Sequence, residues 1–134
     1  MAVVRDVHLV VAFILLAGAF AMGVLALVDR REGRLSARSW RGATHFERLV
    51  LLQAVLGVVL YVGGSRAGTI LHYVYGGVVL VVLALGRGLR PGAALRGTLE
   101  ADYGRFNEPV VFAVLWFFTF GLLARATMTG LFGF

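Results

Sequence analysis

The residues of this sequence best suited to chemistry are its three histidines, His8, His45 and His72. An imidazole can ligate a metal or a heme iron, and it can carry a proton near neutral pH. The sequence contains no cysteine, which excludes disulfides, thiolate metal sites, thiol catalysis and covalent heme attachment through a C-x-x-C-H motif. It also has no phosphate-binding glycine loop, no H-E-x-x-H motif and no paired carboxylates within an apolar segment. Hydrolytic and nucleotide-driven chemistry are therefore not expected.

The composition indicates which elements must position these histidines. Hydrophobic residues make up 60% of the 134 positions and charged residues 15%, and the mean hydropathy is +0.88. Soluble domains contain roughly 45–50% apolar residues, so a fold in water could not bury this much apolar surface. The apolar residues form four long blocks, each near the roughly 20 residues that a transmembrane helix needs. We predict an all-α, integral membrane four-helix bundle in a single transmembrane domain, residues 1–134, with helices at about residues 7–28, 46–62, 69–85 and 108–130.

Polar residues mark where three of these helices should begin. Thr44 and Glu47 have the spacing of a capping box, which predicts the start of the second helix. Thr69 can cap the third helix after a short glycine-rich turn. Asn107 precedes an acid and a proline, a combination typical of a helix N-terminus. The polar segment 86–106 is expected to be a connection.

The arginines predict how the bundle is oriented. All 13 basic residues are arginine, and the net charge is +6. Cytoplasmic loops of membrane proteins carry an excess of basic residues, so we expect both arginine-rich connections to be cytoplasmic and both termini to be outside, in a bacterial-type cytoplasmic (inner) membrane. No basic face with interleaved aromatic residues is present, so nucleic acid is not an expected partner. The arginines of the two connections are Arg30, Arg31, Arg34, Arg38 and Arg41 after the first helix, and Arg87, Arg90, Arg96 and Arg105 after the third.

This topology predicts that two of the histidines meet. His8 opens the first helix and His72 the third, and both helices begin on the outer side, so the two imidazoles should lie at one depth. In a four-helix bundle the first and third helices can occupy opposite corners and point side chains across the bundle axis. Two opposed imidazoles are what a heme iron needs as axial ligands. His45 is on the inner side without a partner and is expected to be an interfacial residue.

Small residues accompany both histidines and have two interpretations. Gly76 lies four residues after His72, and Ala12 lies four residues after His8, so each shares a helix face with its histidine. Small side chains there would let a porphyrin approach the backbone. They would equally let membrane helices pack closely, and a histidine near a helix end is commonly an interfacial or hydrogen-bonding residue. Both interpretations stay open on these residues alone.

One longer segment resembles a known family. The run L-V-L-L-Q-A-V-L-G at residues 49–57 leads through a short outer turn to His72. It resembles the hairpin of the heme A synthase family, in which an L-Q-x-x-L-G helix precedes a helix that opens with a histidine. The match covers roughly residues 5–89, and it implies one four-helix half of that family, in which His8 and His72 form a bis-histidine heme site. The family has an additional helix before its first histidine helix, and the segment 109–130 could fill that corner here.

The sequence departs from this family at positions tied to its reaction. The family has a glutamate three residues before the first histidine and an arginine immediately after it, whereas this chain has Arg5 and Leu9. The family's outer-loop cysteine pair is absent as well. The resemblance implies the oxidation of a heme methyl group, but the carboxylate that the family associates with this reaction is missing here. The chain is therefore not expected to be a complete enzyme. A remnant heme-modifying oxidase is retained as a third interpretation.

Other polar residues also have two interpretations. Arg125, in the outer part of the last helix, can snorkel to the membrane surface, or it can pair with heme propionates together with Arg5 or Arg66. Gln53 is expected to make an interhelical hydrogen bond, and Met128 to serve in packing.

These observations predict a small cytochrome b-like membrane protein. Heme b would be held by His8 and His72 as axial iron ligands, with Gly76 and Arg125 contributing to the cofactor site. The expected role is electron transfer or heme handling, surrounded by membrane lipid, with a quinol or a respiratory complex as partner and homodimerisation as an open question. The alternative is a cofactor-free accessory or structural subunit of a larger membrane complex.

Overall fold

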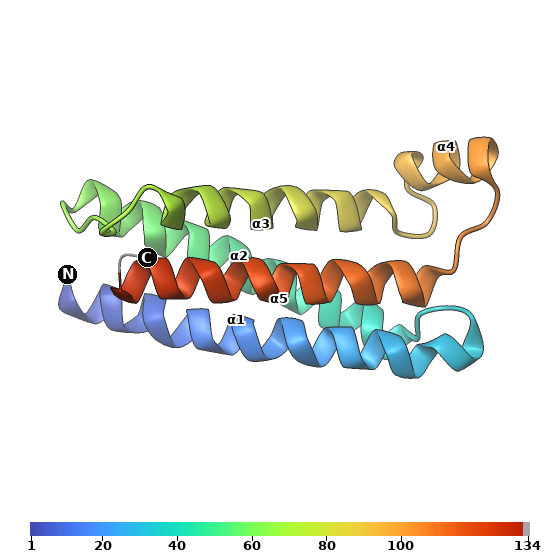
Figure 1. The fold of residues 1–134 in the computed structure, drawn as a ribbon, viewed down its shortest axis with the longest axis horizontal. Coiled ribbons are helices and arrows are strands. Elements are labelled where there is room, and N and C mark those ends of the chain that lie inside the picture. Colours follow the sequence, from blue (N-terminus) through green and yellow to red (C-terminus); the bar gives the residue numbers. More distant parts are fainter. Residues whose placement is uncertain (133–134) are drawn as a thin grey trace.

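The computed structural model describes residues 1–132, and these residues form a bundle built from helices (Figure 1). Four of the helices are long and apolar enough to cross a membrane. The predicted all-α fold and the number of membrane-spanning lengths are therefore confirmed. The elements are α1 (Ala2–Asp29), the short 3-10 helix η1 (Arg30–Glu32), α2 (Ala37–Val62), α3 (Leu71–Gly88), the short α4 (Ala94–Tyr103) and α5 (Glu108–Phe132).

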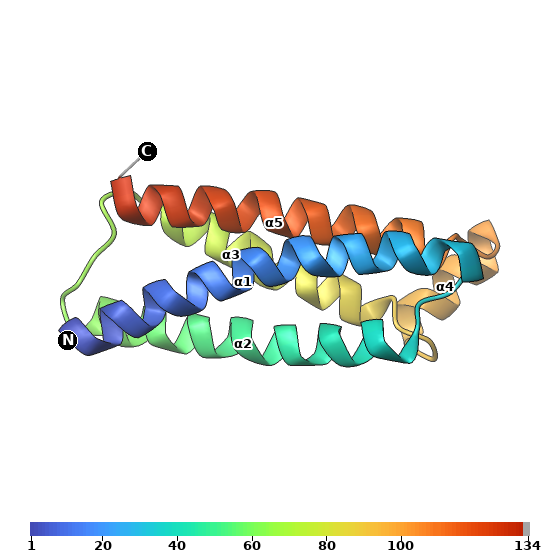
Figure 2. The same ribbon diagram turned by 90° about the horizontal axis from the view of Figure 1, so that it is seen from below.

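The four long helices run alongside one another with alternating direction (Figures 1 and 2). Helix α5 packs against both α1 and α3, and α2 packs against α1, whereas α2 and α3 make few contacts. Helices α1 and α3 therefore occupy opposite corners, and α5 fills the corner between them. This is the arrangement in which side chains of α1 and α3 can face each other across the axis.

The core is formed mainly by α1, α2 and α5. Its buried residues on α1 recur every three or four positions, as expected for one face of a helix, and Ala19 at their centre is 0% exposed. Phe46 of α2 packs edge-on against Trp116 of α5, with 4.9 Å between the ring centroids. The outward faces of the same helices are also apolar, which suits contact with lipid. The α1 core residues are Val11, Leu15, Ala19, Met22 and Ala26.

The two ends of the bundle differ in composition. Helix α1 begins, α2 turns into α3, and α5 finishes at one end (Figure 1); we call it the histidine end because it carries His8 and His72. The opposite end carries η1, α4 and the two arginine-rich connections, and we call it the arginine end. The two connections lie at one end, as their shared charge predicted.

Helix α2 begins more than two turns earlier than the capping-box motif predicted. The first helical residue is Ala37, and Ser36 caps the helix by accepting a hydrogen bond from the Ser39 backbone N–H. Thr44 lies inside the helix, where its hydroxyl donates to the Trp40 carbonyl. The predicted start near residue 46 was therefore wrong, because a serine cap earlier in the sequence satisfies the same helix end.

The other helix boundaries follow the sequence signals more closely. Helix α3 begins within two residues of the predicted position, but its cap is Ile70 rather than Thr69, whose hydroxyl accepts a hydrogen bond from the Leu71 backbone N–H at 3.3 Å. Asn107 accepts one from the Val110 backbone N–H, at 3.3 Å, so it caps α5 as predicted. The segment predicted as a plain connection contains α4, which the sequence analysis missed.

Buried ion pairs fasten the arginine end. Glu108, 5% exposed at the start of α5, accepts a hydrogen bond from the Leu35 backbone N–H at 2.8 Å and pairs with the Arg96 guanidinium of α4. Arg96 also pairs with Glu100, at 2.9 Å. Burial alone would lower the pKa of Arg96, but the hydrogen bonds that its guanidinium donates to Glu108 and Glu100 outweigh burial and raise that pKa above its usual value. One carboxylate thus joins α4, α5 and the start of α2.

A second set of polar contacts positions the first turns of α2. Asp29, buried at the end of α1, accepts hydrogen bonds from the Ser36 backbone N–H at 2.8 Å and from the Ser39 hydroxyl at 2.5 Å. Arg90, just after α3, pairs with Glu47 of α2 at 2.7 Å. These contacts hold the first turns of α2 in a fixed position.

Candidate bis-histidine site

The structure brings His8 and His72 together at the histidine end. His8 lies on the second turn of α1 and His72 on the first turn of α3, and both are half-buried. The centroids of the two imidazole rings are 6.2 Å apart, with an angle of 59° between the ring planes. The opposite corners of α1 and α3 thus produce the juxtaposition that the sequence predicted.

Helix α5 holds the ring of His72. Its Nδ1 lies 2.8 Å from the backbone carbonyl oxygen of Ala126. Because a carbonyl only accepts, Nδ1 must carry the proton and donate, which leaves Nε2 free with its lone pair. Gly130 allows this approach: a Cβ at that position would lie 2.9 Å from Nδ1.

Helix α2 holds His8. The side-chain amide of Gln53 donates from Nε2 to the His8 backbone carbonyl, at 2.9 Å. One turn further along α2, a Cβ at Gly57 would lie 3.4 Å from Cε1 of the His8 ring. The predicted interhelical hydrogen bond of Gln53 is confirmed, and its partner is the backbone of a histidine.

Two polar atoms at this site have no partner within the described chain. Nδ1 of His8 and Oε1 of Gln53 are both buried and make no hydrogen bond with residues 1–132. Leaving a buried polar group unpaired costs about 1–3 kcal/mol, so such atoms are uncommon and call for an explanation. They belong to two residues that touch each other, which indicates a site that these residues do not complete by themselves.

The other residues predicted for the site lie around the histidines. Gly76 is exposed on α3, and a Cβ there would meet nothing within 4 Å, so the space beside it is open. Arg125 is exposed on α5, with its guanidinium 5.9 Å from the centre of the Tyr75 ring on α3. Arg5 is exposed and lies 3.8 Å from Asp6.

Aromatic residues connect the site to the turn between α2 and α3. The ring of His72 meets Tyr73 edge-on at 5.5 Å, and Tyr73 meets Tyr61 of α2 at 5.6 Å. Arg66 lies over the Tyr61 ring at 5.3 Å, and the Tyr73 hydroxyl accepts a hydrogen bond from the Ala67 backbone N–H. The Tyr61–Tyr73 contact joins the end of α2 to the start of α3.

The ligand set restricts what the site could bind. Within residues 1–132, no group of three or more His, Cys, Asp and Glu side chains is placed to hold a metal ion. A structural zinc site takes four protein ligands and a catalytic one takes three, so two imidazoles fall short of both.

The largest differences from the sequence analysis concern what surrounds the histidines. Ala126 and Gly130 were not predicted, because their roles depend on how α5 packs against α3. Gly130 was predicted only as the last residue of a helix, and no sequence signal indicates its contact with His72. His45 is exposed at the arginine end, as predicted.

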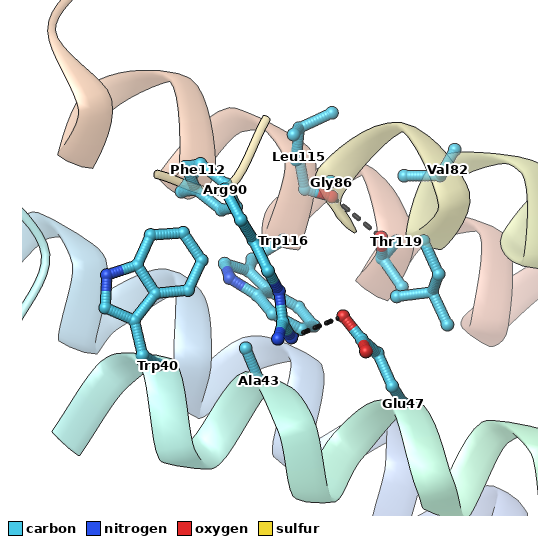
Figure 3. Close-up of a pocket in the computed structure, with 11 residues that line it drawn as sticks. Trp40, Ala43, Glu47, Val82, Gly86, Arg90, Phe112, Leu115, Trp116 and Thr119 are labelled. Atoms are coloured by element: carbon cyan, nitrogen blue, oxygen red, sulfur yellow. Dashed lines mark hydrogen bonds and ion pairs between the residues drawn. The ribbon is translucent and has the colours of Figure 1, made fainter. Parts of the chain in front are cut away.

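A separate pocket lies between α2, α3 and α5 towards the arginine end (Figure 3). The Arg90–Glu47 ion pair spans it, and Trp40, Phe112 and Trp116 form its aromatic wall (Figure 3). Its volume is about 20 Å³, which is room for little more than one water molecule. This pocket is too small for a cofactor.

The chain matches no family model, no curated protein and no solved structure. The resemblance to the heme A synthase family stays a prediction that rests on the residues quoted for it.

Proposed function

We propose that this protein binds one heme b in the membrane, with His8 and His72 as the two axial ligands of the iron. The observation that carries the proposal is the separation of 6.2 Å between the two ring centroids. Two metal–imidazole bonds of about 2.0 Å each place the coordinating nitrogens about 4 Å apart and the ring centres about 6 Å apart. The angle between the rings is free, because both planes contain the axis through the iron and can rotate about it.

The environment of each imidazole supports this assignment. A ligating histidine usually donates its other ring N–H to a carbonyl or carboxylate, which fixes the ring and its tautomer. His72 already has that partner in the Ala126 carbonyl. His8 has an unpaired Nδ1, and the unpaired Oε1 of Gln53 belongs to the side chain that holds His8 in place. The open space beside Gly76 suits a macrocycle edge next to α3.

The ligand set favours electron transfer or heme handling over catalysis on a substrate. A heme with both axial positions filled by protein supplies one-electron exchange and leaves no vacant position on the iron. The residues of this chain would hold the cofactor, exclude water from it and fix its depth in the membrane. A quinol or a respiratory complex is the proposed partner in electron transfer.

The direct test replaces each histidine in turn. His8→Ala and His72→Ala should each convert a low-spin heme spectrum to high-spin or empty the site, since each removes one axial ligand. His45→Ala is the matched control, because that histidine lies at the opposite end of the bundle. Loss of heme in His45→Ala alone would contradict the proposal. Helix insertion should survive all three changes, because about twenty apolar residues per span insert regardless of one imidazole.

The proposed orientation places the histidine end outside and the arginine end in the cytoplasm of a bacterial-type inner membrane. Arg34→Cys and Ser65→Cys, both at exposed positions, would report on the two ends. Ser36 is a poorer reporter because its side chain caps α2. An impermeant thiol reagent applied to intact cells should label only Cys at position 65, and labelling at position 34 alone would reverse the orientation.

A cofactor-free accessory subunit is the second candidate, and the packing of α3 favours it. Among the residues of α3, only Val79 and Val82 are buried, and α3 contacts α2 little. A partner helix, from a larger complex or from a second copy of this chain, would cover this apolar surface as well as lipid does. Protein that purifies colourless after expression with ample heme, together with a co-purifying membrane subunit, would favour this candidate.

A further inference from the structure

The first three turns of α2 carry cationic side chains along one face. These residues recur at intervals of three, four and three positions, which places them on one side of an α-helix, and all are exposed. The opposite face of the same turns is buried in the core through Ser39, Ala43 and Phe46. We call the exposed set the cationic row: Arg38, Arg41, His45 and Arg48.

The cationic row continues a face that is apolar further along the helix. After Arg48 the same side of α2 carries Leu52, Val55 and Val59, all exposed and suited to lipid chains. Helix α2 has 26 residues, which gives a length of about 39 Å at 1.5 Å per residue. The hydrocarbon core of a bilayer is about 30 Å thick, so the first turns of α2 extend beyond it. The row therefore lies at the boundary between the hydrocarbon core and the lipid headgroups.

Arg41, His45 and Arg48 make no ion pair with an acidic side chain of the described chain, whereas Arg38 interacts electrostatically with the Asp29 carboxylate. The ion pairs at the arginine end, within residues 1–132, use Arg90 and Arg96 and leave the row out. The row is also held in place, because Ser36 and Asp29 fix the start of α2. Arg41 and Arg48, which have no acidic partner at this depth, would favour an anionic group supplied from outside the chain.

We propose that the cationic row binds the headgroup phosphates of anionic phospholipid. A guanidinium matches a phosphate with two parallel hydrogen bonds, and long arginine side chains reach along the helix to headgroup level. Lipid is favoured over an acidic protein because the row is continuous with the lipid-facing surface of the same helix. The proposal depends neither on heme binding nor on which side of the membrane the arginine end faces.

Fluorescence of Trp40, a partly buried residue of α2 between Arg38 and Arg41 in the sequence, can test this binding. The chain has two tryptophans, so Trp116→Phe leaves Trp40 as the sole reporter. This protein would be reconstituted in vesicles of brominated phosphatidylglycerol or brominated phosphatidylcholine, mixed with the unbrominated lipids, and the relative affinity of the two lipids obtained from quenching. We expect a preference for phosphatidylglycerol of at least fivefold, since each arginine near a charged headgroup contributes about fivefold.

Variants show whether the row is responsible. Arg41→Gln with Arg48→Gln should bring the preference close to one, whereas Arg41→Lys with Arg48→Lys should keep most of it. Arg5→Gln with Arg66→Gln, at the histidine end, removes the same charge and should leave the preference unchanged. Native mass spectrometry of the unaltered protein, comparing retained phosphatidylglycerol with retained phosphatidylcholine, covers the case in which Trp116→Phe does not fold. Equal affinity for the two lipids, or an unchanged preference in the double glutamine variant, would contradict the proposal and assign the row to topology or to an acidic protein.

Discussion

The two ends of this bundle treat buried polar groups in opposite ways. At the arginine end, Glu108 and Asp29 are buried and each accepts two interactions from the chain itself. At the histidine end, Nδ1 of His8 and Oε1 of Gln53 are buried and find no partner among residues 1–132. Leaving a buried polar group without a hydrogen bond costs the same free energy at either end. Only the arginine end pairs these buried groups within the described chain.

This difference separates an end whose buried polar groups are paired within the chain from the end at which the heme site is proposed. Satisfied buried networks hold neighbouring segments together, as Glu108 holds α4 and α5 to the start of α2. Unsatisfied buried atoms in a native fold mark a strained, catalytic or ligand-binding position. The comparison predicts that changes at the arginine end alter stability, whereas changes at the histidine end alter what the protein binds.

The largest expected effect is on stability at the arginine end. Glu108→Ala leaves the Leu35 N–H without its acceptor and Arg96 without its buried partner, so the free energy of unfolding should fall by about 3 kcal/mol. Glu100→Gln is the control, because that carboxylate is more exposed and its pair with Arg96 should contribute under about 1 kcal/mol. Unfolding in mixed micelles of increasing SDS content measures both. Equal losses in the two variants would show that the buried Glu108 carboxylate contributes no more to stability than the partly exposed Glu100 carboxylate.

A strong effect on heme occupancy is expected from one added methyl group. Gly130→Ala places a Cβ 2.9 Å from Nδ1 of His72, so the ring must move away from the Ala126 carbonyl. The low-spin heme signal should fall by more than half. Gly121→Ala on the same helix is the matched control, since its Cβ would meet nothing within 4 Å. The heme content per chain is measured by absorbance for both variants. Identical heme content would contradict the assignment of His72 as a heme ligand.

A smaller effect is expected at the unpaired amide oxygen. If Oε1 of Gln53 accepts the Nδ1 proton of ligated His8, Gln53→Leu makes that imidazole a weaker electron donor, and the heme midpoint potential should rise by tens of millivolts. Gln53→Glu keeps an acceptor and should lower the potential instead. A redox titration monitored by visible absorbance gives both values. Shifts of the same sign in the two variants would rule out this hydrogen bond.

The smallest effect is expected at Arg125. Its guanidinium lies over Tyr75 on an exposed surface, so any pairing with a propionate is screened by water. Arg125→Leu removes a positive charge near the heme, which should lower the midpoint potential slightly because the oxidised iron becomes less unfavourable. An unchanged potential and heme content would show that Arg125 only contacts Tyr75.

The sequence predicted the long helices well because apolar length and lipid thickness decide them. It also predicted the meeting of His8 and His72, since an even number of spans returns both residues to one end. Local signals were less reliable. Two acceptable caps, Ser36 and Thr44, precede one apolar block, and α2 begins at the earlier one. Helix α4 was missed because its ten residues mix polar and apolar side chains without a membrane-spanning apolar run, and its position depends on the pairing of Arg96 with a residue of α5.

The contacts that define the site could not be predicted from the sequence. The hydrogen bond from His72 to Ala126 joins residues 54 positions apart, and the fit of Gly130 against the ring depends on the separation of α3 and α5. Gln53 was correctly expected to bond between helices, but its partner became evident only from the packing of α2 on α1. Pairings between distant residues are set by tertiary packing, which local sequence patterns do not encode.

The central claim is that the histidine end holds a six-coordinate heme between His8 and His72. The most direct measurement is the visible and electron paramagnetic resonance spectrum of the purified wild-type protein, expressed with ample heme, before and after reduction with dithionite. We expect about one heme per chain, a low-spin ferric signal, and a Soret band that sharpens and shifts on reduction. A colourless protein, or a high-spin heme whose spectrum is the same in His72→Ala, would contradict it.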